Sequence, residues 1–327
     1  MELIGHTSTK NQIAISTISA RRRNRELPHM LFSGVAGCGK TSMARYVANK
    51  LDTDFLSVPA QEFKDQESVL QILEGLNHYG YNEFGDRIDE IKPTILFIDE
   101  IHRVPIVGEE HLGIAMEDYR LSAGKTGKVY WIPYFTVIGA TTDEGLLSKP
   151  FRERFKIKFP FNPYSDKEIE LIIMLHAKAE DIKMQITPLS ARQLAKRSRG
   201  IPRIARSYLE RARDMCLSIG GVKVITSKIV EKTFKELKID GEGLTENEIK
   251  ILKCLHRARM PVGLDNLSII VNESPKTLSQ SVEPFLIRKE FIVRSGKGRI
   301  ITQKGIDYLG AVGKRKKVEI PANYERR

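Results

Sequence analysis

The chain has 327 residues, 41% of them hydrophobic and 29% charged, and carries a net charge of +12. This composition excludes collagen-like, coiled-coil and wholly disordered chains, and the length suits two or three domains. No run approaches the roughly 18–20 consecutive apolar residues of a membrane helix, so we expect no membrane partner. The three cysteines, Cys38, Cys216 and Cys254, lie far apart, and the N-terminus lacks the pattern of a secretory signal. We therefore expect a cytoplasmic protein without a disulfide framework.

The positive charge is concentrated near the C-terminus. Residues 288–327 contain 12 basic and 4 acidic residues, a net charge of +8. A basic module of this kind favours a polyanionic partner, most simply nucleic acid. A solvated tail that only aids solubility explains the charge alone equally well.

The first half of the chain alternates between strand-like and helical segments. Such alternation is typical of an α/β domain with a mostly parallel sheet, and here it extends to about residue 163. We expect strands at residues 29–33, 94–98 and 136–140, and a helix at residues 40–51.

The region that follows is helical, and then gives way to a linker. Residues 166–237 have helical periodicity that breaks at Gly220 and Gly221. Residues 240–243 read DGEG, and two glycines with two acidic residues between helical segments predict a linker.

The segment after the linker has the pattern of a winged helix. Thr245 and Glu248 have the spacing of a capping box, which starts a helix. Three helical patterns precede two strand-like runs that are joined by a glycine-rich turn. The helical patterns span residues 246–257, 264–271 and 275–288, the strands span 291–293 and 299–301, and the turn spans 295–298.

A phosphate-binding loop is the most specific motif. Residues 34–41 read GVAGCGKT and match every fixed position of G-x-x-x-x-G-K-[ST] between an expected strand and an expected helix. Glycines such as Gly37 and Gly39 let backbone N–H groups face phosphate oxygens, and the helix N-terminus adds its dipole. Lys40 would reach the β- and γ-phosphates, and the Thr41 hydroxyl would bind Mg²⁺. The motif predicts ATP and Mg²⁺ as cofactors.

A second phosphate motif follows about 60 residues after the loop. Residues 95–100 read ILFIDE, an apolar strand that ends in two carboxylates at the sheet edge where α/β proteins bind ligands. Asp99 would hold Mg²⁺ through water, and Glu100 would orient and polarise the attacking water. For the nearby His102 we favour packing of its ring over a role as a sensor.

Three further features point to ATP hydrolysis across a subunit interface. Thr142 follows an apolar strand and offers a hydroxyl to sense the γ-phosphate. Arg152 and Arg154 follow, and Arg203 lies near the start of a helix. An arginine supplied by a neighbouring subunit accelerates such reactions by about 10³–10⁵.

The hairpin of the predicted winged helix is basic. Lys297 lies between two glycines, with Arg294 and Arg299 on either side. A flexible hairpin of this kind suits phosphates or a minor groove, and its contacts would be largely independent of DNA sequence. Winged helices also bind proteins, so this alternative stays open.

Several segments together resemble the RuvB family, the AAA+ motors of bacterial Holliday-junction branch migration. The resemblance covers about residues 3–312. It is carried by LFIDEIHR at 96–103, AMEDY at 115–119, IGATT at 138–142, RGIPRIA at 199–205, GLD at 263–265 and VEPFL at 282–286.

The resemblance implies an α/β fold in which an AAA+ P-loop ATPase domain precedes a helical lid and a C-terminal winged-helix domain. Their expected ranges are 1–163, 164–240 and 244–312, with a basic tail at 313–327. Family members assemble as hexamers around duplex DNA. The resemblance therefore implies a homo-oligomer, double-stranded and four-way-junction DNA as partners, and a possible RuvA-like junction-binding protein.

The resemblance also implies roles for individual residues. Asp99 and Glu100 match the Walker B pair, Arg154 the arginine finger and Arg203 the second sensor. The matching nucleotide-binding positions are Gly37, Lys40, Thr41, Ser42, Glu117, Asp118, Tyr119 and Tyr164, and Arg294 and Arg299 match DNA-contacting arginines of the wing.

The chain departs from the family pattern in four places. The family carries an Arg-Pro segment before the position of Ile4, so we expect part of the adenine pocket to be missing. Residues 77–92 are an insertion, and Asp143 stands where the family has arginine. The hairpin between Tyr119 and Thr136, which engages RuvA in the family, is shorter. The ATPase interpretation survives these differences, whereas dependence on a RuvA-like partner stays open.

The function that the resemblance implies for this chain is an ATP-driven hexameric motor that moves duplex DNA and drives branch migration of Holliday junctions. Two other functions compete with this motor. One is a clamp-loader-like or initiator-like ATPase, which uses ATP as a switch to place another protein on DNA. The other is a DNA-binding regulator with a vestigial nucleotide site. A vestigial site has no physical need for the full set of Lys40, Asp99, Glu100, Arg154 and Arg203.

Overall fold

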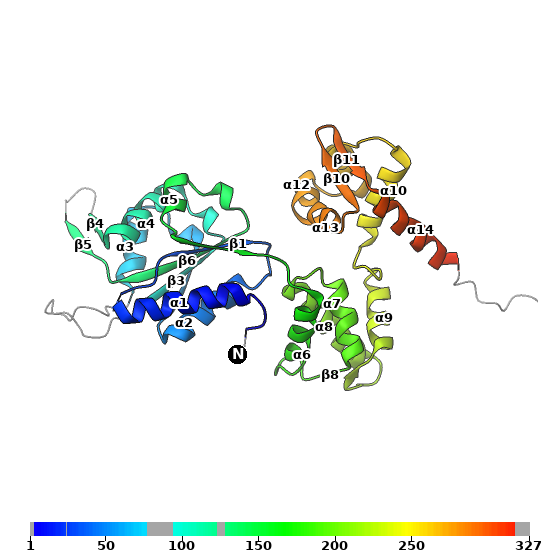
Figure 1. Cartoon of the computed structure of the whole chain (residues 1–327), viewed down its shortest axis with the longest axis horizontal. Coiled ribbons are helices and arrows are strands. Elements are labelled where there is room, and N and C mark those ends of the chain that lie inside the picture. Colours follow the sequence, from blue (N-terminus) through cyan, green and yellow to red (C-terminus); the bar gives the residue numbers. More distant parts are fainter. Residues whose placement is uncertain (1–2, 24, 77–93, 123–127, 318–327) are drawn as a thin grey trace, which may run out of the picture. The chain divides into compact units, whose positions relative to one another are not determined.

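The structure is a computed structural model, and it describes residues 3–23, 25–76, 94–122 and 128–317 (Figure 1). The chain divides into two compact units. An N-terminal unit comprises Met1–Ile172 with Gly200–Arg206, and a C-terminal unit comprises Ile173–Arg199 with Ser207–Arg327. The insertion expected at residues 77–92 lies outside the described residues.

A five-stranded parallel sheet forms the centre of the N-terminal unit. Its strand order is β2-β3-β6-β1-β7. The central strand β6 is buried along its whole length, as expected for a parallel sheet that is covered on both faces. The three predicted strands are confirmed to within one residue. The strands are β1 (Met30–Gly34), β2 (Phe55–Pro59), β3 (Thr94–Asp99), β6 (Phe135–Thr141) and β7 (Ile157–Phe161).

Helices cover both faces of this sheet because successive strand residues point to opposite sides. Ile95 and Phe97 join the core on one face, whereas Leu96 and Ile98 join the core on the other. The helices of this unit are α1 (Thr7–Arg23), α2 (Lys40–Leu51), α3 (Gln66–Glu74), α4 (Ile106–Asp118) and α5 (Lys149–Glu153), and the short strands β4 (Arg120–Ser122) and β5 (Val129–Trp131) form an antiparallel hairpin (Figure 1).

A buried histidine links the sheet to α4. His29 lies directly before β1 and is 7% exposed. Its Nδ1 accepts a hydrogen bond from the Val137 backbone N–H at 2.9 Å, and its Nε2 lies 3.0 Å from the Met116 carbonyl oxygen. The ring is therefore neutral, with its proton on Nε2. Burial lowers the pKa of His29 to about 4.

This histidine makes the stability of the N-terminal unit depend on pH. The unfolded chain binds a proton near pH 6.5, whereas the folded unit resists protonation until about pH 4. The stabilisation is therefore complete above pH 6.5 and is lost as the pH falls toward 4, by about 3 kcal/mol in total. We expect urea unfolding at several pH values to show a smaller acid-induced loss in His29→Gln than in the parent. Parallel curves for the two proteins would contradict this assignment.

The lid helices, predicted as one helical region at 166–237, are interrupted by a small parallel strand pair that the sequence analysis did not foresee. Strand β8 (Gln185–Ile186) pairs with β9 (Val224–Ile225). The helices are α6 (Asp166–Ala177), α7 (Pro188–Arg197), α8 (Pro202–Ser218) and α9 (Ser227–Glu236). Helices α6 and α8 each begin in the N-terminal unit and continue into the C-terminal unit.

The winged helix is confirmed as three helical segments and a hairpin. The predicted capping box at Thr245 and Glu248 is present. The helix expected at 275–288 contains a π-helical turn, and the last helix continues through the first five residues of the expected basic tail. The elements are α10 (Glu246–Ala258), α11 (Leu264–Val271), α12 (Pro275–Thr277), the π-helical η4 (Leu278–Val282), α13 (Glu283–Arg288), β10 (Ile292–Ser295), β11 (Gly298–Ile301) and α14 (Gln303–Lys317).

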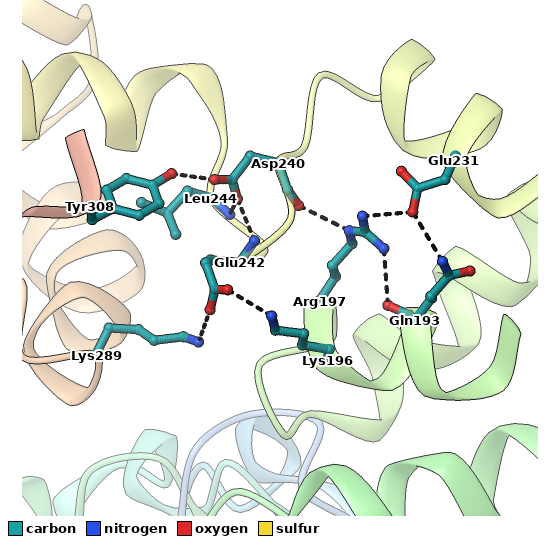
Figure 2. Close-up of polar contacts among 9 residues, drawn as sticks. All are labelled: Gln193, Lys196, Arg197, Glu231, Asp240, Glu242, Leu244, Lys289 and Tyr308. Carbon is teal, nitrogen blue, oxygen red and sulfur yellow. Dashed lines mark hydrogen bonds and ion pairs between the residues drawn. The ribbon is translucent and has the colours of Figure 1, made fainter. Parts of the chain in front are cut away.

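The segment predicted as a linker, residues 240–243, is held from both sides rather than free (Figure 2). Arg197 of the lid donates from Nε to the Asp240 carbonyl oxygen at 3.0 Å. Tyr308 of α14 donates to the Asp240 carboxylate. Asp240 therefore connects the lid to the winged helix.

Glu242 makes a second connection of the same kind (Figure 2). Its carboxylate lies 2.7 Å from Lys196 of α7 and 3.1 Å from Lys289, which directly follows α13. Burial opposes ionisation, yet the hydrogen bonds from the two lysines lower the pKa of Glu242. An ion pair between Arg199 and the buried Glu248, at 2.8 Å, adds a third link. These contacts explain why the lid and the winged helix form one compact unit.

None of the helices in the described ranges is both long and apolar enough to cross a membrane.

Candidate nucleotide-binding site and nucleic-acid interface

The phosphate loop lies between β1 and α2, as the motif requires. Gly37 and Gly39 have φ values of 81° and 89°, which disfavour any residue with a Cβ atom. A Cβ on Gly37 would lie 2.8 Å from the Cβ of Arg203, and one on Gly39 would lie 2.9 Å from the Tyr164 hydroxyl. Two of the predicted nucleotide-site residues, Arg203 and Tyr164, therefore pack directly against the loop.

Lys40 turns back across this loop. Its Nζ donates to the carbonyl oxygens of Gly34 at 2.7 Å and Val35 at 3.2 Å, and the side chain is 6% exposed. Burial lowers the pKa of Lys40, while the charges of Glu100 and Asp99 oppose that shift. The lysine and the two predicted carboxylates therefore share one electrostatic environment.

The two carboxylates lie where β3 ends. Asp99 accepts a hydrogen bond from the Glu100 backbone N–H at 3.0 Å. Glu100 has a φ of 48°, and its Oε2 accepts from the Thr142 hydroxyl at 2.9 Å and from the Thr142 N–H at 3.4 Å. Because β3 and β6 are neighbours in the sheet, Thr142 reaches Glu100 from the next strand.

The donors present at this edge suit magnesium. Thr41 lies in the first turn of α2, and Asp99 supplies a carboxylate at the end of β3. Mg²⁺ favours a few protein oxygens and completes its octahedral shell with water and phosphate. Within the described part of the chain, no group of three or more His, Cys, Asp or Glu side chains could hold a metal alone. Thr41 and Asp99 are the residues at this edge that would hold the ion.

His102 makes polar contacts that the interpretation of ring packing did not include. Its Nδ1 lies 2.8 Å from the Thr141 hydroxyl oxygen and 3.3 Å from Glu100 Oε2. The histidine thus contacts the predicted catalytic carboxylate, and its place three residues after Asp99 was the signal available in the sequence.

The N-terminal segment adds a residue that the sequence analysis did not assign. His6 Nε2 donates to the Cys38 carbonyl oxygen at 3.2 Å, inside the phosphate loop. The centre of its ring lies 4.6 Å from that of Tyr164. Burial lowers the pKa of His6, which favours the neutral ring. His6 and Tyr164 therefore form an aromatic wall beside the loop.

The predicted arginine finger lies with the predicted AMEDY residues, at α4 and α5. Arg154 Nη2 lies 3.0 Å from Glu117, and Arg154 is 29% exposed. Asp118 lies 3.9 Å from Arg120, and the Tyr119 ring packs edge-on against Tyr134. The structure therefore brings Arg154 and Glu117 into contact. The action of these residues on a neighbour's nucleotide stays a prediction.

The wing arginines share a partner that the sequence analysis missed. Strands β10 and β11 pair Arg294 with Arg299, and both guanidinium groups contact the buried carboxylate of Glu283. Lys297 is exposed at the turn between the strands. The predicted basic hairpin is therefore present, with its two arginines held by one acid.

Comparisons with known proteins match all three parts of the chain to one family. Family models match for the Holliday junction DNA helicase RuvB P-loop domain at residues 1–161, the RuvB AAA lid domain at 164–240 and the RuvB C-terminal winged helix domain at 241–310. The chain belongs to the RuvB family. The predicted resemblance and fold class, an AAA+ P-loop domain with a lid and a winged helix, are confirmed.

Individual relatives support this membership. The Holliday junction branch migration complex subunit RuvB of Streptococcus thermophilus is 38% identical over 317 residues, which cover 94% of this chain and 90% of the relative. The structure of the Thermotoga maritima RuvB Holliday junction branch migration motor is 36% identical and has a TM-score of 0.76, with 94% of this chain and 95% of that chain covered. The structure of a mutant of the same Thermotoga maritima protein has a TM-score of 0.78 at 35% identity, covering 98% of each chain.

Proposed function

We propose that this protein is an ATP-hydrolysing motor that moves duplex DNA and drives branch migration of Holliday junctions. The observation that carries the proposal is the convergence of independent phosphate-site elements on one loop. Lys40, Asp99, Glu100 and Thr142 share an electrostatic and hydrogen-bonded environment, and the Cβ of Arg203 packs against Gly37. A vestigial site would not retain this arrangement.

The residues divide the chemistry between binding and water activation. Lys40 and the N–H groups of the loop bind the phosphates of ATP, with Gly39, Thr41 and Ser42 at the start of α2. Mg²⁺, when held by Thr41 and Asp99, would neutralise phosphate charge. Glu100 orients the attacking water, and Thr142 fixes the position of its carboxylate. Positioning and charge neutralisation are what phosphoryl transfer needs most.

We further propose that the subunits act as a hexamer in the cytoplasm. Arg154 of one subunit would complete the site of its neighbour, with Glu117, Asp118 and Tyr119 beside it. Helix α8 begins at the nucleotide loop with Arg203 and continues into the C-terminal unit. In that unit Glu242 and Asp240 join the lid to the winged helix, so a lid movement would carry the winged helix with it.

DNA would contact the wing through Arg294, Lys297 and Arg299. A RuvA-like partner is also part of the proposal, because the shortened hairpin still exposes a large apolar side chain. Trp131 of β5 is 74% exposed. Exposed tryptophan is typical of residues that anchor protein partners.

An ATPase assay with and without DNA, combined with imaging of the same sample, gives a first test of the motor. We expect ATP turnover to rise with four-way-junction DNA, and negative-stain images of the same sample to show rings. Lys40→Ala should abolish turnover with and without DNA. Turnover that ignores DNA, in a sample without rings, would contradict the motor.

A further inference from the structure

Glu283 stands out because it is an acid buried beneath a basic surface. It is the first residue of α13 and follows the π-helical turn η4, and its side chain is 2% exposed. Arg294 donates from Nε to Oε2 at 2.8 Å, and its Nη2 lies 2.6 Å from the same oxygen. Arg299 donates from Nε to Oε1 at 2.5 Å and from Nη2 to Oε2 at 3.2 Å. One carboxylate thus holds two guanidinium groups.

The Glu283 carboxylate offsets the repulsion between the two guanidinium groups. Arg294 and Arg299 lie directly opposite each other on β10 and β11, and like charges in that position repel. A buried carboxylate is costly unless it is paired and hydrogen-bonded, and here both oxygens accept hydrogen bonds. The cluster of two arginines and one acid keeps a net charge of +1 for a partner outside it.

The two arginines are not equally available to that partner. Arg299 is 16% exposed, whereas Arg294 is 49% exposed. Arg294 uses Nε and Nη2 for Glu283, and its Nη2 also donates to the Ser279 carbonyl oxygen at 3.1 Å. Among the described residues, Nη1 of Arg294 has no hydrogen bond. One edge of this guanidinium is therefore fixed by the protein, and the other is left for a phosphate.

We propose that Glu283 is a positioning residue for DNA binding. Its carboxylate holds the guanidinium of Arg294 in place to contact a backbone phosphate, and Arg299 in turn holds the carboxylate. The proposal rests on the proposed function, in that it requires the wing to bind DNA. A side chain that is already ordered loses less conformational freedom on binding, so the contact becomes tighter. The planar guanidinium suits this role because it can hold a carboxylate and a phosphate on different edges.

The proposal predicts that loss of the Glu283 charge weakens DNA binding, whereas electrostatics alone predicts tighter binding. Removing a negative charge near DNA should by itself tighten binding. If Glu283 positions Arg294, however, Glu283→Gln should weaken duplex binding by about fivefold to tenfold. The measurement is the dissociation constant of the full-length protein for labelled duplex DNA, over a series of salt concentrations.

A double-mutant cycle separates positioning from a general loss of the wing's structure. Arg294→Ala should weaken binding and flatten the slope of log K against log salt by about 0.9 for each engaged subunit. The double variant Glu283→Gln with Arg294→Ala should bind like Arg294→Ala alone, because the acid acts through this arginine. Glu283→Asp should recover part of the affinity. The unfolding transition of each variant is measured as well, to show whether the wing stays folded. If Glu283→Gln proves unstable, Glu283→Asp is the variant that keeps the test possible.

Lys297→Ala provides the control for the proposed function, since this exposed lysine lies on the same wing. If Lys297→Ala and Arg294→Ala both bind like the parent, the wing does not bind DNA and that part of the proposed function fails. If both weaken binding while Glu283→Gln binds equally or more tightly, the positioning role is wrong and DNA binding by the wing stands. Losses from Glu283→Gln and Arg294→Ala that add would also overturn the positioning role.

Discussion

Glu100→Gln is expected to bind ATP about as tightly as the parent protein and to hydrolyse it at least about 100 times more slowly. A positioned general base contributes roughly 10²–10⁴ to such rates, and glutamine has the same size without the negative charge. Its amide oxygen can still accept the hydrogen bond that Thr142 now gives to the carboxylate at 2.9 Å. The local geometry should therefore survive while water activation is lost.

The measurement pairs nucleotide binding with single-turnover hydrolysis. Lys40→Ala is the control that should lose binding of the ATP phosphates, because Nζ of Lys40 lies within the phosphate loop. The contrast between the two variants assigns binding to the loop and hydrolysis to the end of β3. Hydrolysis by Glu100→Gln at the parent rate would show that this strand does not supply the base.

Arg154→Ala is expected to bind ATP and to lose about 10³-fold or more in turnover, because the arginine acts on ATP held by the neighbouring subunit. Mixing this variant with Lys40→Ala should partly restore hydrolysis. Some interfaces in the mixed assembly then pair an intact Lys40 with an intact Arg154. The measurement is the steady-state ATPase rate against mixing ratio.

Arg152→Ala is the matched control, since it removes the neighbouring arginine of the same short segment. It should retain most of the turnover. The pair between Arg154 and Glu117 makes a purely structural role the competing explanation. In subunits shown to co-assemble, failure to recover activity at every mixing ratio would favour that explanation.

The parts of the fold that sequence predicted well are those set by local patterns. The loop at residues 34–41 needs glycine for its backbone geometry, and the buried strands are short apolar runs bounded by polar residues. The expected helix at 40–51 has the same bounds as α2. Such signals lie within a few residues of the feature that they specify.

The features that the sequence analysis missed depend on partners far along the chain. Glu283 meets arginines 11 and 16 residues away on a hairpin, and residue spacing alone does not show which acid will face which base. The DGEG segment has a composition that suits either a loose linker or a bonded turn. Tyr308, 68 residues away, is one of the partners that decide between them. His102 likewise gains its partner Thr141 only through the pairing of β3 with β6.

The most direct test of a DNA motor is the conversion of a labelled four-way junction with homologous arms into duplex products. The assay is run with the protein alone and with a RuvA relative, since the hairpin leaves the need for that partner open. We expect products to accumulate with ATP and Mg²⁺ for the parent, and not for Glu100→Gln. ATP hydrolysis without junction conversion in either setting would contradict the motor and favour the switch. Conversion by Glu100→Gln at the parent rate would show that hydrolysis does not drive movement.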